Sequence, residues 1–375
     1  MRVLIVGGGV GALETTLALK SLAGDRVDVQ VLAPDARFAY RPLWVAEPFV
    51  HEEPWSAPLA RLVKSAGARL MHGTLAGVDL DARIARADDG AEIGWDALVL
   101  ALGARMADGV PGSLTFRGPA DHDAFSRLVD KAVAGRFKSL TFALPGGVGW
   151  ALPLYELALM TDIRLADSGQ VPVRIDLMTP EEEPLGLFGH AISRSMERTL
   201  ASRGIRLHVR TTPVAFENGA LETIPETTLE ADRVVSLPTP RGRSISGLVG
   251  DSHGFVRTDA FGRLVGRGDV YAVGDMTAFP IKHGGIATEQ ADVAAEAIAA
   301  LAGAPVEPRP FRPVLRGLLF SGLSPTFLAA DLLDGESRSG TEPLWSPPHK
   351  IVGRYLAPFL AEHGLSMPGE WVEAA

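Results

Sequence analysis

The chain contains one local pattern twice: an apolar segment of strand length, a glycine turn and a segment with helical spacing. The first copy spans residues 2–22 and turns at Gly7-Gly8-Gly9. The second spans residues 139–160 and turns at Pro145-Gly146-Gly147-Val148-Gly149. Strands that alternate with helices in this way form parallel sheets covered by helices. The sequence therefore predicts an α/β fold with two Rossmann-like units of three layers.

The first glycine turn has the spacing of a dinucleotide-binding loop, because residues 7–12 fit the pattern G-x-G-x-x-A. Gly7 permits the tight turn, Gly9 lets the backbone approach a pyrophosphate, and Ala12 replaces the third glycine in helix packing. Gly11 lies in the first helical turn, whose free N–H groups attract phosphate. The alternative interpretation is a plain strand-turn-helix without a ligand.

The acidic residue that usually holds the adenosine ribose is missing. Rossmann folds place it at the end of the second strand, where this chain has Ala33 and Pro34, with Asp35 just beyond. We expect either backbone groups at Ala33 and Pro34 or the Asp35 carboxylate to bind this end of the cofactor.

A second ligand-binding segment lies far downstream. Residues 269–273 have the composition of a buried strand and run into Gly274-Asp275. An alanine-rich helix is expected over 286–302, after Gly284-Gly285. In flavoproteins with two dinucleotide-binding units, a glycine loop holds the pyrophosphate and a late strand presents an aspartate to the ribityl chain. The two segments together predict FAD as the cofactor.

Three segments, in this order and spacing, carry a family resemblance: residues 7–14, 96–103 and 270–275. They resemble the FAD-dependent pyridine nucleotide-disulfide oxidoreductase superfamily over residues 1 to about 305. Residues 40–45 and 279–288 look most like the sulfide:quinone oxidoreductase and type II NADH dehydrogenase branches.

The resemblance implies roles for several short segments. An early proline-containing loop lines the flavin, a strand-end turn packs near it, and a late aspartate binds the ribityl chain. The following helix points its N-terminus at the flavin pyrimidine, where it stabilises negative charge. The matching residues here are Arg41, Pro42, Ala101, Gly103, Gly274, Asp275 and Ala287, with Ile286 and Thr288 beside Ala287.

Lys282 and His283 are the candidate catalytic residues, and Lys282 is also a candidate for cofactor binding. Lys282 matches a lysine of the sulfide:quinone branch, and His283 is next to it. A cation beside the flavin or quinone would steady a developing anion or deliver a proton. The alternative is a solvated loop lysine and a histidine hydrogen-bonded to backbone.

Cysteine is absent from all 375 residues. This absence excludes zinc-thiolate sites and the redox thiols that sulfide oxidation and disulfide reduction use in the family. The nine histidines show no metal-binding spacing, so no metal site is expected. A flavin without a thiol must exchange electrons directly with its donor and acceptor.

The second glycine turn is a poor nicotinamide site. Gly147-Val148-Gly149 is followed by Trp150 and Pro153, which would crowd a pyrophosphate, and no small third residue follows. Acidic residues at 181–183 follow the next strand, where an acid would favour NADH over NADPH, although such a run is usually a solvated turn. NAD(P)H therefore stays a possible substrate and not a firm one.

The order of elements predicts a split FAD domain at 1–105 and 240–305, with an NAD(P)-binding-like domain at 106–239 inserted into it. A small C-terminal α+β region follows at 306–375. There we expect a hairpin of residues 316–321 and 326–332 and a helix over 350–361 interrupted at Pro358. The apolar stripe of that helix packs on its own domain or a partner subunit, or, as a less favoured alternative, lies on a membrane.

The sequence predicts a cytoplasmic FAD-dependent oxidoreductase, because no signal segment precedes the first strand. Electrons would pass from a small donor, with NAD(P)H possible, to a quinone or other small acceptor without a cysteine relay. A net charge of -9 argues against nucleic acid as a partner, and a homo-oligomer is possible. The alternative is an FAD-binding protein of low intrinsic turnover that acts through a protein partner.

Overall fold

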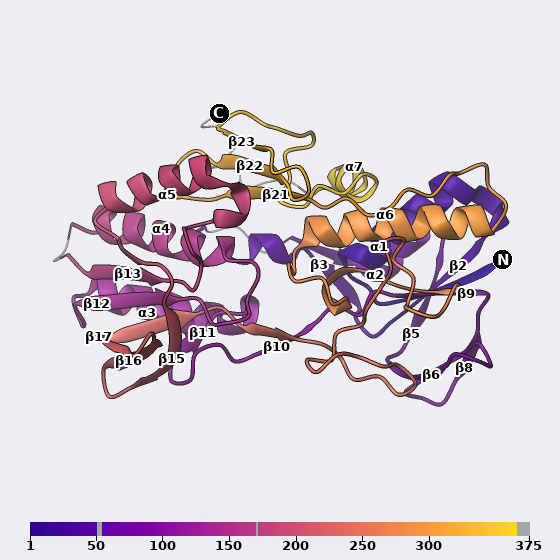
Figure 1. Cartoon of the computed structure of the whole chain (residues 1–375), viewed down its shortest axis with the longest axis horizontal. Helices are drawn as coiled ribbons and strands as arrows, with labels where there is room; N and C mark the ends of the chain where they lie inside the picture. The colour runs from indigo at the N-terminus through magenta and orange to yellow at the C-terminus, as the bar shows by residue number, and fades with distance from the viewer. Residues whose placement is uncertain (51–54, 170–171, 366–375) are drawn as a thin grey trace.

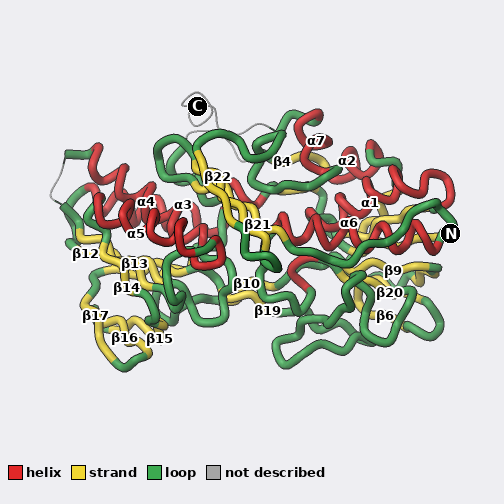
Figure 2. Tube along the Cα trace, turned by 45° about the horizontal axis from the view of Figure 1, so that its top comes forward, coloured by secondary structure: helices red, strands yellow, loops and turns green. Residues whose placement is uncertain are grey.

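The computed structural model describes residues 1–50, 55–169 and 172–365 and shows an elongated molecule with two lobes (Figure 1). Each lobe contains a five-stranded parallel sheet. Helices cover these sheets, and a smaller antiparallel sheet lies over both lobes (Figures 1 and 2). This arrangement confirms the predicted α/β class.

The first lobe is built on the strand order β20-β9-β1-β2-β5. These strands are β1 (Arg2–Val6), β2 (Asp28–Ala33), β5 (Arg69–His72), β9 (Ala97–Leu100) and β20 (Val270–Ala272). Helices α1 (Val10–Ala23) and α6 (Gly284–Leu301) lie side by side on one face. The late strand β20 pairs with β9, so residues 270–272 return to the sheet that residues 2–100 begin.

The outer parts of this lobe are small antiparallel units. A three-stranded sheet of β6 (Leu75–Asp79), β7 (Ile84–Ala87) and β8 (Glu92–Gly94) turns between β7 and β8 at Gly90. Strands β3 (Arg37–Ala39) and β4 (Ser56–Pro58) form a pair that leads into helix α2 (Leu59–Ser65).

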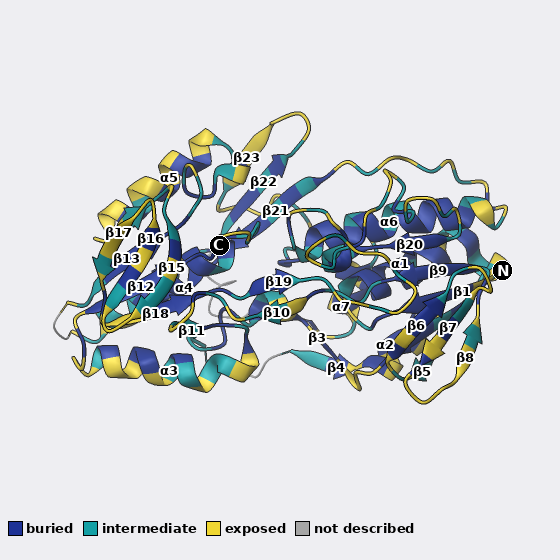
Figure 3. Cartoon of the chain, turned by 60° about the horizontal axis from the view of Figure 1, so that its bottom comes forward, coloured by how far each residue is buried: buried dark blue, intermediate teal, exposed yellow. Residues whose placement is uncertain are grey.

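The second lobe has the strand order β11-β18-β12-β13-β14. The strands are β11 (Leu114–Thr115), β12 (Ser139–Ala143), β13 (Arg174–Met178), β14 (Arg206–His208) and β18 (Arg233–Ser236). The helices are α3 (Pro119–Val133), α4 (Leu152–Asp167) and α5 (His190–Ser202), and a meander of β15 (Thr212–Glu217), β16 (Ala220–Ile224) and β17 (Thr227–Glu230) lies at one end. The central strand β12 is entirely buried, whereas the outer faces of the helices are exposed (Figure 3).

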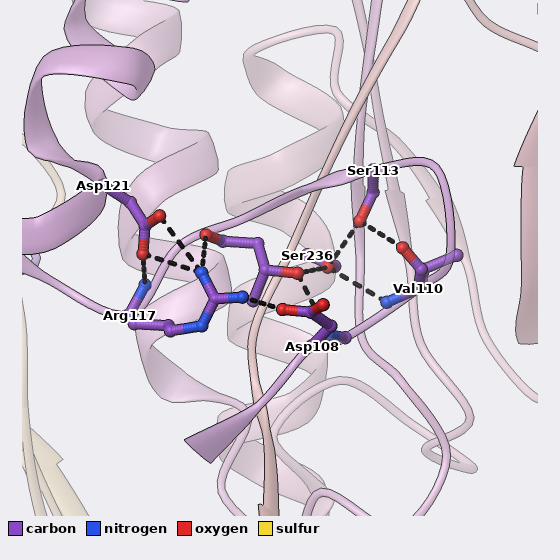
Figure 4. Close-up of polar contacts among 8 residues, drawn as sticks. Asp108, Val110, Ser113, Arg117, Asp121 and Ser236 are labelled. Atoms are coloured by element: carbon purple, nitrogen blue, oxygen red, sulfur yellow. Dashed lines mark hydrogen bonds and ion pairs between the residues drawn. The ribbon is translucent and has the colours of Figure 1, made fainter.

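Two antiparallel strands, β10 (Arg105–Ala107) and β19 (Thr239–Arg241), connect the lobes. Figure 4 shows how polar contacts fix the chain beside this crossing. The Ser236 hydroxyl accepts a hydrogen bond from Val110 N at 3.2 Å and lies 2.7 Å from the Ser113 hydroxyl. Arg117 binds Asp108 and Asp121. The residue boundaries predicted for the domains stay predictions.

The C-terminal region corrects one prediction. Strands β21 (Val314–Leu319) and β22 (Thr326–Asp331) form the expected hairpin, and β23 (Ser337–Gly340) adds a third strand. The helix predicted over 350–361 is wrong in its start, because α7 spans Leu356–Glu362 and Pro358 falls in its first turn. The preceding residues leave the helix because their peptide groups bind Tyr40, Thr288 and Glu14.

The apolar stripe predicted in this tail is largely inside the molecule. Ile351, Leu356, Phe359 and Leu360 are buried in the main hydrophobic core. Among the described residues, no helix is long and apolar enough to cross a membrane. The predicted cytoplasmic location stays a prediction.

Candidate functional site

The first glycine loop is held tightly on one side and open on the other. Gly7 has φ +128°, and a Cβ there would lie 2.2 Å from the carbonyl oxygen of Ala101. Helix α1 begins at Val10, directly after Gly9, and a Cβ at Gly9 would meet no atom within 4 Å. Because a pyrophosphate needs bare backbone at a helix N-terminus, this loop has the geometry that such a ligand requires.

Several predicted residues meet where α1, α6 and the end of β20 converge. A Cβ at Gly11 would lie 3.0 Å from Val273 Cγ2 and 3.8 Å from the Ala287 carbonyl oxygen. Gly274 has φ +73°, and its Cβ would lie 3.1 Å from the Ala287 side chain. Ala12 is fully buried. Small residues therefore let the N-terminal ends of the two helices approach the same point.

Asp275 follows at this point, on the short helix η4 (Gly274–Met276). Burial raises the pKa of its carboxyl group, and the positive charges of Lys282 and then Arg41 oppose this rise. Among the described residues, no hydrogen bond ends on its carboxylate, so its oxygens are available to a ligand's hydroxyl groups.

Lys282 is fixed by its own loop. Its ammonium group donates hydrogen bonds to the carbonyl oxygens of Thr277 and Phe279, and it lies 3.7 Å from the centroid of the Phe255 ring. Burial lowers the pKa of Lys282 to about 8, against the opposing effect of Asp275. A lysine with this pKa is mostly protonated at neutral pH and gives up its proton readily.

His283 differs from its neighbour. Burial lowers the pKa of this imidazole to about 3, and the nearby positive charges of Lys350 and Arg316 add to the effect. Its ring lies 4.4 Å from the Trp150 ring, between centroids, and in the described part of the chain its buried Nδ1 has no hydrogen-bond partner. His283 is therefore neutral at neutral pH, which favours a packing role over proton transfer.

The remaining predicted residues lie at or after the ends of strands β2, β3 and β9. Ala33 is buried at the end of β2, whereas Pro34 and Asp35 are exposed. Arg41 and Pro42 form the short helix η2 (Arg41–Leu43), where the Arg41 guanidinium lies 5.5 Å from the Trp44 ring centroid. Ala101 packs against Gly7, and Gly103 (φ +64°) has open space where a side chain would point. The structure places all these residues in the first lobe, and their roles in binding stay predictions.

The second glycine loop is blocked at Gly149, although a Cβ at Gly147 would meet no atom within 4 Å. Helix α4 begins only at Leu152, after Trp150 and Ala151, and has proline in its first turn. A Cβ at Gly149 would lie 2.4 Å from the Pro280 carbonyl oxygen. The loop therefore packs directly against the segment that carries Lys282 and His283.

Sequence reasoning missed two buried carboxylates that hold the C-terminal segment. Glu14 of α1 accepts hydrogen bonds from Tyr355 N at 2.9 Å and Leu356 N at 2.6 Å. Glu156 of α4 pairs with Lys350 at 2.5 Å, with side-chain exposures of 1% and 6%. The available signal was an acid inside an otherwise apolar helical stretch, which is seldom buried without a partner.

The described residues contain no group of three or more side chains that could hold a metal ion. The site consists of a glycine loop and two converging helix ends, with Asp275 next to them and with Lys282 and Arg41 close enough to lower the pKa of Asp275. Such a site can hold an extended anionic ligand and place one titratable cation near it.

A model of the pyridine nucleotide-disulphide oxidoreductase family matches residues 1–298. The chain is 27% identical over 215 residues to a sulfide-quinone reductase of Aquifex aeolicus (strain VF5), which covers 54% of this chain and 49% of that protein. It is 25% identical over 406 aligned positions to a monodehydroascorbate reductase of Pisum sativum, covering 95% and 90%. The match thus spans about half of the first relative and most of the second.

Solved structures show the same fold. A sulfide:quinone oxidoreductase from Aquifex aeolicus has a TM-score of 0.80 at 21% identity, covering 91% of this chain and 87% of that chain. A ferredoxin reductase from Rhodopseudomonas palustris has a TM-score of 0.63 at 17% identity, covering 88% and 81%. The predicted fold, with two Rossmann-like units, is confirmed by these likenesses.

Proposed function

The chain belongs to the pyridine nucleotide-disulphide oxidoreductase family. On this premise we propose that it is an FAD-dependent oxidoreductase, and we propose its electron donor and acceptor. We infer that a small donor reduces FAD and that a quinone or another small acceptor takes the electron pair. The observation that supports this proposal is that the end of β20, which carries Asp275, converges with the N-terminal ends of α1 and α6, with Lys282 and Arg41 near Asp275.

The residues present fit FAD. The open backbone at Gly9 and the first turn of α1 would hold the pyrophosphate, and the Asp275 carboxylate would accept hydrogen bonds from the ribityl hydroxyls. The N-terminus of α6, at Gly285 to Ala287, would stabilise negative charge on the ring. When bound, FAD supplies two-electron chemistry between donor and acceptor.

Lys282 is the residue to which we assign proton delivery. Its ammonium group is half-buried, lies near Asp275 and has a pKa of about 8. An acceptor oxygen that gains electrons needs a proton, and a donor with a pKa near the working pH delivers it best. His283, neutral and packed on Trp150, has no such role in this proposal.

The relatives suggest candidate substrates. A sulfide-quinone reductase supports a quinone as the acceptor, and a monodehydroascorbate reductase supports another small organic acceptor. Sulfide oxidation through redox thiols is excluded because the chain has no cysteine.

The cofactor assignment is tested by Asp275→Ala, with Asp25→Ala as the control because Asp25 is a fully exposed surface acid. We expect the purified wild type and the control to show a flavin absorbance spectrum, and Asp275→Ala to lose most of its FAD on gel filtration. Full flavin retention by Asp275→Ala would contradict the ribityl role.

The role of Lys282 is tested by reoxidation of the chemically reduced enzyme with a soluble quinone across the pH range. Wild-type turnover should fall as pH rises above about 8, because the lysine then has no proton to give. Lys282→Met should be slow at every pH with flavin retained. Lys282→Arg keeps the charge but has no proton to transfer, because arginine stays protonated, so it should be as slow as Lys282→Met. Fast turnover of Lys282→Arg without the alkaline fall would contradict proton delivery and leave Lys282 only the role of a positive charge. If no quinone or dye reoxidises the enzyme faster than oxygen does, the alternative of a low-turnover FAD protein that serves a partner is favoured.

A further inference from the structure

Trp150 fills the space between the second glycine loop and the loop that carries Lys282. Its ring centroid lies 4.4 Å from that of His283 on one side and 5.9 Å from that of Phe188, edge-on, on another. The three rings come from three separate segments of the chain. Trp150 therefore closes this junction with its own side chain.

The surroundings are shaped to admit the indole ring. At Gly317 of β21, a Cβ would lie 2.9 Å from Phe188 Cζ and 3.4 Å from the outer edge of the Trp150 ring. Any larger residue at 317 would displace one of these rings. The buried pair Lys350–Glu156 supports the same region, because Lys350 lies close enough to His283 to lower its pKa and contacts the Phe320 ring at 4.0 Å.

We propose that Trp150 is a specificity-determining wedge that keeps nicotinamide dinucleotides from the flavin, so that the electron donor is smaller than a dinucleotide. A dinucleotide whose pyrophosphate lay on residues 145–149 would have to pass its nicotinamide between this loop and residues 280–283. Gly149 already touches the Pro280 carbonyl there, and the Trp150 ring occupies the adjoining space. This inference rests on the proposed function, because it names the class of donor for that site.

The helix start also departs from the arrangement that holds a pyrophosphate in the first loop. Helix α4 starts at Leu152, two residues beyond Trp150, and Pro153 contributes no N–H group. The wedge and the delayed helix start act together, since one removes the space for the nicotinamide and the other weakens the phosphate site. A nicotinamide ring is a flat aromatic of smaller area than indole, so removal of the Trp150 side chain would leave space for it.

The experiment measures NAD⁺ binding by calorimetry and anaerobic flavin reduction by NADH and NADPH, on the purified FAD-loaded protein. The variants are Trp150→Ala and the milder Trp150→Leu, which keeps apolar packing if the alanine variant folds poorly. Trp55→Ala is the control, because Trp55 packs edge-on against Phe38 in the first lobe, whereas Trp150 follows the second glycine loop. Circular dichroism checks that each variant is folded.

We expect both Trp150 variants to bind NAD⁺ and to be reduced by NADH at least about tenfold better than the wild type and the control, a difference of about 1.4 kcal/mol. Equal NAD⁺ affinity and equal reduction in wild type and folded Trp150 variants, whether both are high or both undetectable, would overturn the wedge. Failure of the proposed function looks different: no quinone or dye would reoxidise the reduced FAD-loaded protein faster than oxygen does, while the comparison of NAD⁺ affinities would still decide the inference.

Discussion

The two glycine loops follow similar buried strands, β1 and β12, yet they use glycine for opposite purposes. At Gly9 the missing side chain leaves open space in front of a helix that starts at once. At Gly149 the backbone of Pro280 occupies the space where a side chain would lie, and helix α4 starts only at Leu152. The same local pattern therefore prepares a ligand site in one lobe and a contact between lobes in the other.

The helices that follow the two loops extend this comparison. Each carries a buried glutamate as its fifth residue, Glu14 in α1 and Glu156 in α4. Both glutamates bind the C-terminal segment, Glu14 through backbone N–H groups and Glu156 through Lys350. This segment thus ties the two lobes together, by backbone hydrogen bonds to Glu14 on one side and an ion pair with Glu156 on the other.

Breaking the ion pair between Lys350 and Glu156 should have the largest effect on stability. Lys350→Ala leaves the Glu156 carboxylate buried without its partner, so we expect the free energy of unfolding to fall by about 3–5 kcal/mol. The double variant Lys350→Met, Glu156→Leu removes both charges and should come much closer to the wild type. Urea unfolding monitored by circular dichroism measures the difference, with the exposed Lys64→Ala as control. A loss of under about 1 kcal/mol for Lys350→Ala would break the comparison, because the pair would then behave as an exposed one.

The stability that the region around Glu14 contributes should instead depend on pH. Asp292 of α6 lies beside Glu14, and burial, followed by the charge of Glu14, raises the pKa of Asp292 to about 9. Arg354 opposes this rise and Glu296 adds to it. The folded protein therefore keeps a proton up to about pH 9 that the unfolded chain releases near pH 4. Because of this difference, the free energy of unfolding falls as pH rises between those values.

For one proton, the free energy of unfolding falls by about 1.4 kcal/mol for each pH unit, or by about 2.8 kcal/mol between pH 6 and pH 8. Asp292→Asn cannot release this proton, so its free energy of unfolding should lack that slope. Urea unfolding at several pH values measures it, with the exposed Asp123→Asn as control. A slope that is the same in wild type and Asp292→Asn would show that the two carboxyl groups do not share a proton.

The sequence predicted what local patterns encode. The strand-glycine-helix units, the return of residues 270–272 to the first sheet and the hairpin near residue 320 all follow from apolar periodicity and turn residues, and the structure contains them. The contacts of Glu14, Glu156 and Trp150 were not predictable, because their partners are far away in the sequence. The predicted start of α7 was wrong for the same reason: hydrogen-bond partners far away in the sequence, and not helical spacing, decide where residues 350–355 lie.

The smallest effects on stability should come from alanine at Gly9 and Gly149, the corresponding glycines of the two loops. Which of the two variants loses stability and which loses FAD affinity is the sharpest test of the comparison. Gly149→Ala places a Cβ against the Pro280 carbonyl and should lower the free energy of unfolding by about 1–3 kcal/mol through overpacking, with FAD retained.

A Cβ at Gly9 would meet no protein atom, and Gly9 has φ -92°. Gly9→Ala should therefore lower the free energy of unfolding by less than about 1 kcal/mol, as a change of the helix N-cap. In the ligand-binding loop, however, the same methyl group would stand where the pyrophosphate approaches, and FAD affinity should fall at least about tenfold. Thermal unfolding and fluorescence titration of FAD measure the two quantities on each variant. If Gly149→Ala lost FAD with unchanged stability while Gly9→Ala lost stability with unchanged FAD affinity, the assignment of the two loops would have to be reversed.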